Sequence, residues 1–236
     1  MEKEKNKEKT GILNEKKLGI LVAIFLGLTT LLVAWAGWIG SLHSGIQAIN
    51  FTKSNNLAAE GNSEYNVAAQ IYISDLFAWN SILSLQIDME NAREKGDKEE
   101  EKVIEAKIQK IMNGSCSPKL LEAISSMNLQ EKTNSPFEKE EFVNSYFEKS
   151  KELLVKSQQT LEEGKQDNLR GDSYKLVTVI YSLVLFLLGI VGILKDFQSR
   201  KLLFIISVGI LIFGIIYMLT IPMPTGFNIA NFFKFK

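Results

Sequence analysis

Three stretches of the chain contain no Asp, Glu, Lys or Arg and consist mainly of apolar residues: 18–52, 176–194 and 202–233. An apolar helix of about 20 residues matches the roughly 30 Å hydrocarbon core of a bilayer. The pattern therefore predicts a membrane protein and excludes a water-soluble globular fold. We place the three helical spans at residues 18–42, 174–194 and 202–221.

The first span has an alternative interpretation as a signal peptide. Ala34 and Ala36 flank Trp35 as they would in a cleavage site. The apolar run continues through Trp38 and Ile39, however, and is longer than the apolar region of about 7 to 15 residues in a signal peptide. We therefore expect an uncleaved membrane anchor.

Basic residues predict the orientation of the spans. Segment 1–17 contains six Lys and the short connection 195–201 contains three basic residues. Lys and Arg in short segments favour the cytoplasmic side. We therefore expect a protein of the inner or plasma membrane, with both segments in the cytoplasm. Residues 43–173 would then lie on the extracytoplasmic side. Residues 222–236 combine Phe with Lys, which predicts an interfacial tail on that outer side.

The region 43–173 shows helical spacing. Its first part has an apolar stripe at alternating steps of four and three residues, which is typical of a helix and of a short coiled coil. The stripe consists of Tyr65, Ala69, Tyr72, Leu76, Trp79 and Leu83. Gly96 and Asp97 interrupt the pattern, and a second helix follows with Ile104, Ile108 and Ile111.

Two helix starts follow in the same region. Ser117 before Pro118 predicts a cap followed by a proline in the first turn. Ser135, with Glu138 three residues later, predicts a capping box that opens a last, long helix. That helix has small residues at intervals of seven, which would let a neighbouring helix approach closely: Ser150, Ser157 and Gly164.

These patterns predict an all-α fold. Three transmembrane helices would carry an extracytoplasmic antiparallel helical hairpin or bundle between the first and the second. Two long helices would bury their aromatic and aliphatic stripes against each other, with two shorter helices at the far end.

Charge narrows the partners. The chain has 27 basic and 27 acidic residues, so its net charge does not support nucleic-acid binding. Within 43–173 there are 15 basic and 22 acidic residues, which makes the predicted outer region acidic. Apart from Lys175 at the outer edge of the second span, the spans carry no Asp, Glu, Lys or Arg, which disfavours ion-coupled transport.

Reactive side chains are scarce. The chain has one His, His43, and one Cys, Cys116. His43 lies where the first span meets water and has no neighbouring motif of a metal site. A lone Cys forms no intrachain disulfide, so we expect a free thiol, with an intermolecular bridge as the alternative. We therefore expect no catalytic residue, metal or cofactor.

Small residues recur every four positions where the first span ends, at Ala36, Gly40, Ser44 and Ala48. Such a face suits close helix packing. It is a candidate contact with a second copy or with the chain's own span pair, and we favour the latter.

The chain resembles a group of prokaryotic inner-membrane proteins with three spans and no assigned activity. The resemblance rests on residues 26–38, LGLTTLLVAWAGW, with Gln47 after a turn containing Ser and Gly. It also rests on Asp75, Leu76 and Phe77 in a helix rich in Asn and Ala, and on a span pair ending near Pro222. The Phe-rich extension after Pro222 departs from the group. The resemblance implies the three-span topology and no catalytic residue.

The leading hypothesis is a non-enzymatic multi-pass membrane protein. Its outer helical region would act as a scaffold, partner-binding or sensing module, in contact with the bilayer and with a protein partner or a second copy. The alternative is a subunit of an oligomeric channel, which the small-residue face suggests.

Overall fold

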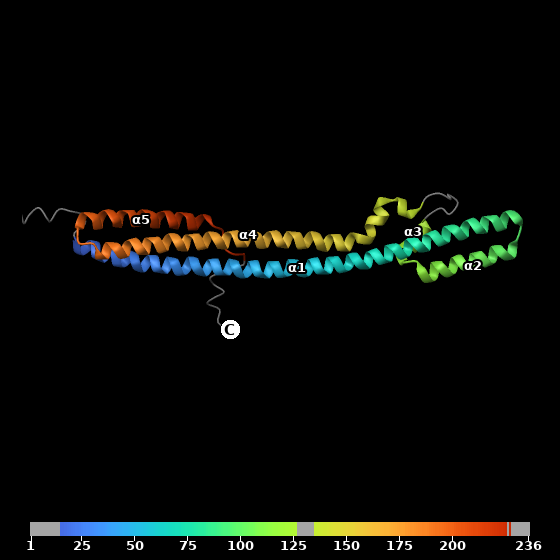
Figure 1. The fold of residues 1–236 in the computed structure, drawn as a ribbon, viewed down its shortest axis with the longest axis horizontal. Helices are drawn as coiled ribbons and strands as arrows, with labels where there is room; N and C mark the ends of the chain where they lie inside the picture. The colour runs from blue at the N-terminus through green and yellow to red at the C-terminus, as the bar shows by residue number, and fades with distance from the viewer. Residues whose placement is uncertain (1–14, 127–134, 226, 228–236) are drawn as a thin grey trace, which may run out of the picture. The chain divides into compact units, whose positions relative to one another are not determined.

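The computed structural model describes residues 15–126, 135–225 and 227. These residues form five α-helices and one short 3₁₀ helix (Figure 1), and no strand occurs among them, as the sequence predicts. The elements are α1 (Glu15–Lys95), α2 (Lys98–Ser115), α3 (Pro118–Ser126), η1 (Pro136–Glu138), α4 (Glu140–Ile193) and α5 (Phe197–Thr220). Most of the predicted Lys-rich segment 1–17 and the end of the aromatic tail 222–236 lie outside the described residues.

Gly96 ends α1, as the interruption of the pattern predicts. Its φ of 72° is in the left-handed region, which glycine adopts without steric cost. The Gly96 amide donates to the Arg93 carbonyl at 3.1 Å and the Asp97 amide to the Ala92 carbonyl at 3.0 Å. These two bonds form a Schellman motif. Asp97 then caps α2, because its carboxylate accepts the Glu100 amide at 3.0 Å.

The two predicted helix starts have different outcomes. The Ser117 hydroxyl accepts the Leu120 amide at 3.2 Å and caps α3, as predicted. Ser135 caps only the 3₁₀ turn η1, since its hydroxyl accepts the Phe137 amide. The prediction that Ser135 opens the long helix was therefore wrong: α4 begins at Glu140, after the backbone turns away from helical angles at Lys139.

The chain divides into two compact units. Unit 1 comprises residues 1–52 and 160–236, and unit 2 comprises 53–159. Helices α1 and α4 each contribute residues to both units.

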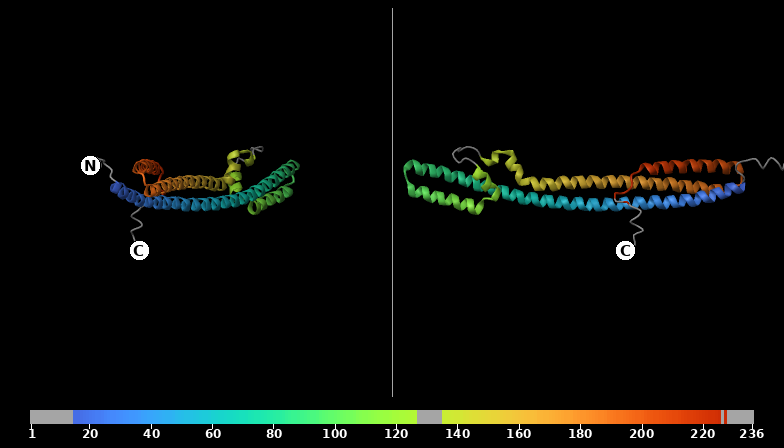
Figure 2. Two further views of the ribbon diagram at one scale, coloured as in Figure 1. Left: turned by 60° about the vertical axis from the view of Figure 1, so that its left-hand side comes forward. Right: turned by 180° about the vertical axis from the view of Figure 1, so that it is seen from behind.

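In unit 1, α4 and α5 run side by side as an antiparallel pair, with α1 against them (Figures 1 and 2). The non-helical connection between α4 and α5 is short, because Phe197–Lys201 already belong to α5. Gly214 of α5 allows close approach: a Cβ atom at this position would lie 2.7 Å from the Tyr181 ring of α4. Phe25 of α1 packs edge-to-face on Phe204 of α5, with the ring centres 5.4 Å apart.

Helices α1, α4 and α5 are each long and apolar enough to span a membrane. They expose large apolar side chains around a buried core, which fits a hydrocarbon environment and not water. The exposed residues of α5, for example, include Leu202, Ile205, Ile212, Phe213, Ile216 and Leu219. The protein is therefore an all-helical membrane protein, as its charge-free runs predict.

In unit 2, α1 and α4 pack antiparallel through small residues. The Ser157 hydroxyl donates to the Ser54 carbonyl at 2.8 Å. Two turns further along α1, the Ser150 hydroxyl donates to the Gly61 carbonyl at 2.8 Å. The predicted small-residue positions Ser150 and Ser157 thus lie in the contact. The two helices are so close that serine hydroxyls of α4 reach backbone carbonyls of α1 directly.

The predicted apolar stripe of α1 is confirmed in part. Trp79 is buried, and Ala69, Tyr72, Leu76 and Leu83 are half-buried. Tyr65 is 51% exposed, although it was expected in the core. A neighbouring row toward α4 and α2 is also buried; it consists of Ser54, Gly61, Ala68, Asp75 and Ile82. Small and polar side chains occupy most of this second row because α4 approaches closely.

The two shorter helices cover the remaining part of α1 in unit 2 (Figure 2). Ile104 and Ile108 of α2 are buried there, as their spacing predicts. Leu120 and Ile124 of α3 join the same apolar cluster around Trp79.

Candidate functional sites

Unit 2 contains a buried carboxylate at Asp75, which is 1% exposed. The Ser117 amide donates to one carboxylate oxygen at 2.7 Å. The other oxygen accepts the Ser117 hydroxyl at 2.5 Å and the Tyr146 hydroxyl at 2.7 Å. Three donors compensate for the loss of water around a carboxylate. Asp75 therefore joins α1, the start of α3 and α4.

This carboxylate perturbs its neighbours. Burial and the hydrogen bond to Asp75 raise the pKa of the Tyr146 hydroxyl. Burial and the Asp75 charge raise the pKa of the Cys116 thiol, a free, half-buried cysteine. A raised pKa leaves less reactive thiolate at neutral pH. Cys116 is thus poorly suited to act as a nucleophile.

Unit 1 contains a second buried polar group, the pair of His43 on α1 and Asp167 on α4. The His43 Nδ1 atom lies 2.9 Å from Asp167 Oδ1, and the imidazole side chain is fully buried. Its Nε2 atom lies 3.2 Å from the Pro222 carbonyl oxygen. The Tyr174 ring stacks on the imidazole, and Arg170 lies 3.7 Å from the same Asp167 oxygen.

The contacts of His43 join three helices. Asp167 belongs to α4, and Pro222 lies two residues beyond the end of α5. Both ring nitrogens of His43 are thus within hydrogen-bond distance of an oxygen atom of the same chain. The pair therefore ties the segment after α5 to α1 and α4.

The sequence missed this pair. His43 was interpreted as a lone interfacial residue, but it is buried against a partner 124 positions away. One signal was present: Asp167 follows Gly164 by three residues and precedes Gly171 by four, in the same seven-residue pattern that marks the packed face of α4. A charged residue in such a row requires a buried partner.

The predicted packing face lies mainly against the same chain. Ala36 and Gly40 are buried, Ser44 is half-buried and Ala48 is exposed. A Cβ atom at Gly40 would lie 3.2 Å from Cβ of Tyr174. The first part of this face is thus occupied by α4 of its own chain.

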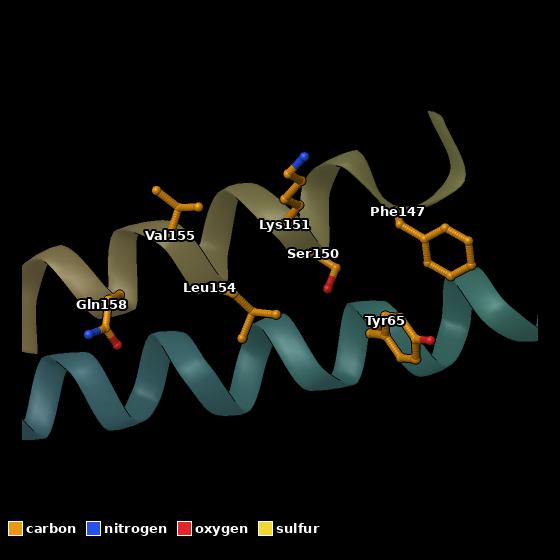
Figure 3. A pocket seen from close by; sticks show the side chains of 7 residues that line it. All are labelled: Tyr65, Phe147, Ser150, Lys151, Leu154, Val155 and Gln158. Atoms are coloured by element: carbon orange, nitrogen blue, oxygen red, sulfur yellow. The ribbon is translucent and has the colours of Figure 1, made fainter. Parts of the chain in front are cut away.

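A shallow groove of about 400 Å³ lies between α1 and α4 in unit 2 (Figure 3). Tyr65 and Phe147 lie at one end of it, and Leu154 and Val155 line its length. The groove is open and mostly apolar, with Lys151 at its rim, so it is a surface depression and not an enclosed ligand site.

One face of α1 in unit 2 is exposed and uncharged. Its eleven positions follow alternating steps of three and four residues from 56 to 91, and every one is exposed. We call it the uncharged face; it consists of Asn56, Ala59, Ser63, Asn66, Gln70, Ile73, Phe77, Asn80, Ser84, Ile87 and Asn91. Phe77 is 68% exposed, Ile87 62% and Ile73 50%. This second row was not predicted, although it has the same spacing as the predicted one.

Among the described residues, no group of three or more His, Cys, Asp or Glu side chains is arranged to hold a metal ion. No family model matches the chain, and no curated protein or solved structure is significantly similar to it. The resemblance to three-span inner-membrane proteins stays a prediction.

Proposed function

We propose that the protein is a non-enzymatic membrane protein whose helical region 43–173 is a scaffold that binds a protein partner on the extracytoplasmic side. The spans would anchor this region in the inner or plasma membrane. Partner binding is favoured over sensing of a small ligand, because the polar groups of Asp75 and His43 are already engaged with the chain's own atoms.

The uncharged face carries this proposal. From Tyr65 to Ile87, the only charged residue of α1 is Asp75, which is buried. By contrast, α2 places charged side chains in nearly every turn. A helix face in water normally carries charge, and an exposed apolar patch rimmed by polar residues marks an interaction surface. The uncharged face mixes apolar residues with small polar ones. In this composition it resembles the buried rows of α1 and α4 more than a helix surface in water.

Contacts in unit 1 support the proposal that the two basic segments lie on the same side of the membrane. Arg200, in the basic connection before the last span, lies 3.4 Å from Glu15 at the start of α1. His43, just after the first predicted span within α1, meets Pro222, just after α5. The two segments expected in the cytoplasm are thus at one end of the span bundle, and the ends leading to 43–173 and 222–236 are at the other. Trp35, Trp38 and Phe227 cluster near that second end, which suits a membrane interface.

Site-specific photocrosslinking in native membranes tests partner binding. A photoreactive phenylalanine analogue would replace Phe77 on the uncharged face. In the control it would replace Tyr65, which is also aromatic and exposed on α1 but lies beside the groove. We expect protein adducts from position 77 and few from position 65. Equal yields at both positions, or no protein adduct at position 77, would contradict the proposal.

A further inference from the structure

We propose that the uncharged face binds the same face of a second copy, in a parallel two-fold dimer of α1 helices. The inference rests on the proposed function and names the partner.

The first argument is the position of the face on the helix. Phe77 lies two residues after buried Asp75 and two before buried Trp79, so each is about 200° away around the helix. The row that α4 covers and the uncharged face are therefore on opposite sides of α1. A second helix can pack on the uncharged face without displacing any contact within the chain.

The spacing of the face suits a helix of the same kind. Alternating steps of three and four over eleven positions follow a seven-residue repeat, which is the pattern of a coiled-coil seam. The apolar members Ile73, Phe77 and Ile87 would supply the buried contacts. At about 1.5 Å per residue, the row from 56 to 91 is roughly 50 Å long.

The absence of charge favours a second copy over an unrelated partner. Both copies have α1 starting in the same membrane, so they would pair in parallel. In a parallel two-fold contact each residue of the row meets its own counterpart, and a charged residue would face a like charge. None of the eleven positions is charged. The neighbouring positions between Asn62 and Leu83 that do not face α4 are uncharged as well, so the face has no charge pattern that would select an oppositely charged partner.

The polar members are compatible with self-pairing. The Asn side chain both donates and accepts hydrogen bonds, so two identical Asn residues can bond across a two-fold axis. Asn66 and Asn80 alternate with Ile73 and Ile87 in the row. Polar residues in a coiled-coil seam fix register at a cost in stability. The dimer would therefore be weak in solution and strengthened by confinement of both copies to one membrane.

Cysteine crosslinking of the full chain in native membranes tests the dimer. Cys116→Ser removes the only native thiol, and single cysteines are then placed at adjacent exposed positions of α1. Asn66→Cys and Gln70→Cys lie on the uncharged face, whereas Tyr65→Cys and Ile71→Cys lie beside it. A disulfide needs Cα atoms about 4.4 to 6.8 Å apart, which equivalent positions of a parallel seam satisfy. Under mild oxidation we expect disulfide dimers from positions 66 and 70 and few from 65 and 71.

A charge placed on the face adds a second readout. Ile73→Glu in the Asn66→Cys protein would bring two carboxylates together in the dimer, and we expect about tenfold less crosslinking. Ile71→Glu adds the same charge beside the face and is expected to leave the yield unchanged. Both residues are exposed, so neither change disturbs the core of unit 2.

The outcomes separate the two proposals. Equal crosslinking at all four positions indicates random collision and overturns the dimer. No self-crosslinking, together with photocrosslinking of position 77 to a different protein, overturns the dimer and leaves the proposed function standing. No self-crosslinking and no protein adduct at position 77 overturns both.

Discussion

Asp75 and Asp167 are buried carboxylates in helices that otherwise pack through small and apolar side chains. Each is compensated, Asp75 by three donors from Ser117 and Tyr146 and Asp167 by His43. Loss of a partner would leave a buried polar group without its hydrogen bonds, which costs more than the bond itself contributes. These two residues should therefore be sensitive to substitution in spite of having no catalytic role in our proposal.

Removal of His43 tests the buried pair of unit 1. We expect His43→Leu to lower the free energy of unfolding by about 3 to 5 kcal/mol, because Asp167 keeps a buried charge with only Arg170 nearby. His43→Leu combined with Asp167→Leu should cost less than His43→Leu alone. Titration of the detergent-purified protein with a denaturing detergent measures both. A double variant less stable than the His43→Leu variant would contradict the account.

The reactivity of Cys116 tests the surroundings of Asp75. Because burial and the Asp75 charge raise the thiol pKa, alkylation by a maleimide should be slower than that of a free cysteine at neutral pH. The alkylation rate should increase with pH, and the pH at its midpoint should be higher than for free cysteine. Asp75→Asn should shift the midpoint downward. A midpoint in the unsubstituted protein at or below that of free cysteine would be inconsistent with this environment.

The helices owe their limits to local chemistry. Gly96 ends α1 with a left-handed backbone, Asp97 starts α2, and Ser117 starts α3. Ser117 also donates to Asp75, so the cap of α3 is fixed to α1 by the same hydroxyl. Ser117 is thus recognisable from sequence as a helix cap, but its bond to Asp75 is not.

Two glycines of unit 2 should respond differently to substitution by alanine. Gly96→Ala should lower stability by about 1 to 2 kcal/mol, because a Cβ atom strains a residue at positive φ. Gly114→Ala in α2 meets no neighbouring atom and should be neutral or slightly stabilising, since alanine favours helix. Thermal unfolding of the two variants provides the measurement. Equal effects would argue against the left-handed turn at Gly96.

Within unit 1 the predicted spans have apolar surfaces, whereas charged side chains are exposed on unit 2 and on residues 160–175 of unit 1. Unit 1 exposes apolar side chains on all three of its helices, as a bilayer requires. Unit 2 exposes charged side chains on α2 and α4 and keeps the uncharged face on α1. This division of surfaces supports a membrane anchor joined to a region in water with one face reserved for protein contact.

Labelling of single cysteines from outside the cell tests the orientation. In the Cys116→Ser background, Ser115→Cys should react with a membrane-impermeant maleimide on intact cells, because unit 2 is proposed to be extracytoplasmic. Gln198→Cys, at the start of α5, should react only after lysis. Both residues are exposed, so burial does not limit either reaction. The reverse pattern would invert the proposed topology.

Much of the architecture was predictable from the order of residues. The charge-free runs predicted three helices suited to span a membrane, and Gly96, Asp97 and Ser117 predicted helix ends correctly. The prediction at Ser135 was wrong because Lys139 leaves the helical conformation between the cap and α4. The apolar stripe of α1 was correct at Trp79 and wrong at Tyr65, because α4 approaches closest along the adjacent row of small residues, which includes Gly61 and Ala68.

Composition along the chain was sufficient for the spans and the helices, since hydrophobic length and capping depend on neighbouring residues. The pairing of His43 with Asp167 and the binding of Asp75 by Ser117 and Tyr146 were not accessible in this way. They join positions that are 124, 42 and 71 residues apart. Such contacts exist only once two helices approach along rows of small side chains, and that approach also determines which row of α1 is covered and which remains exposed.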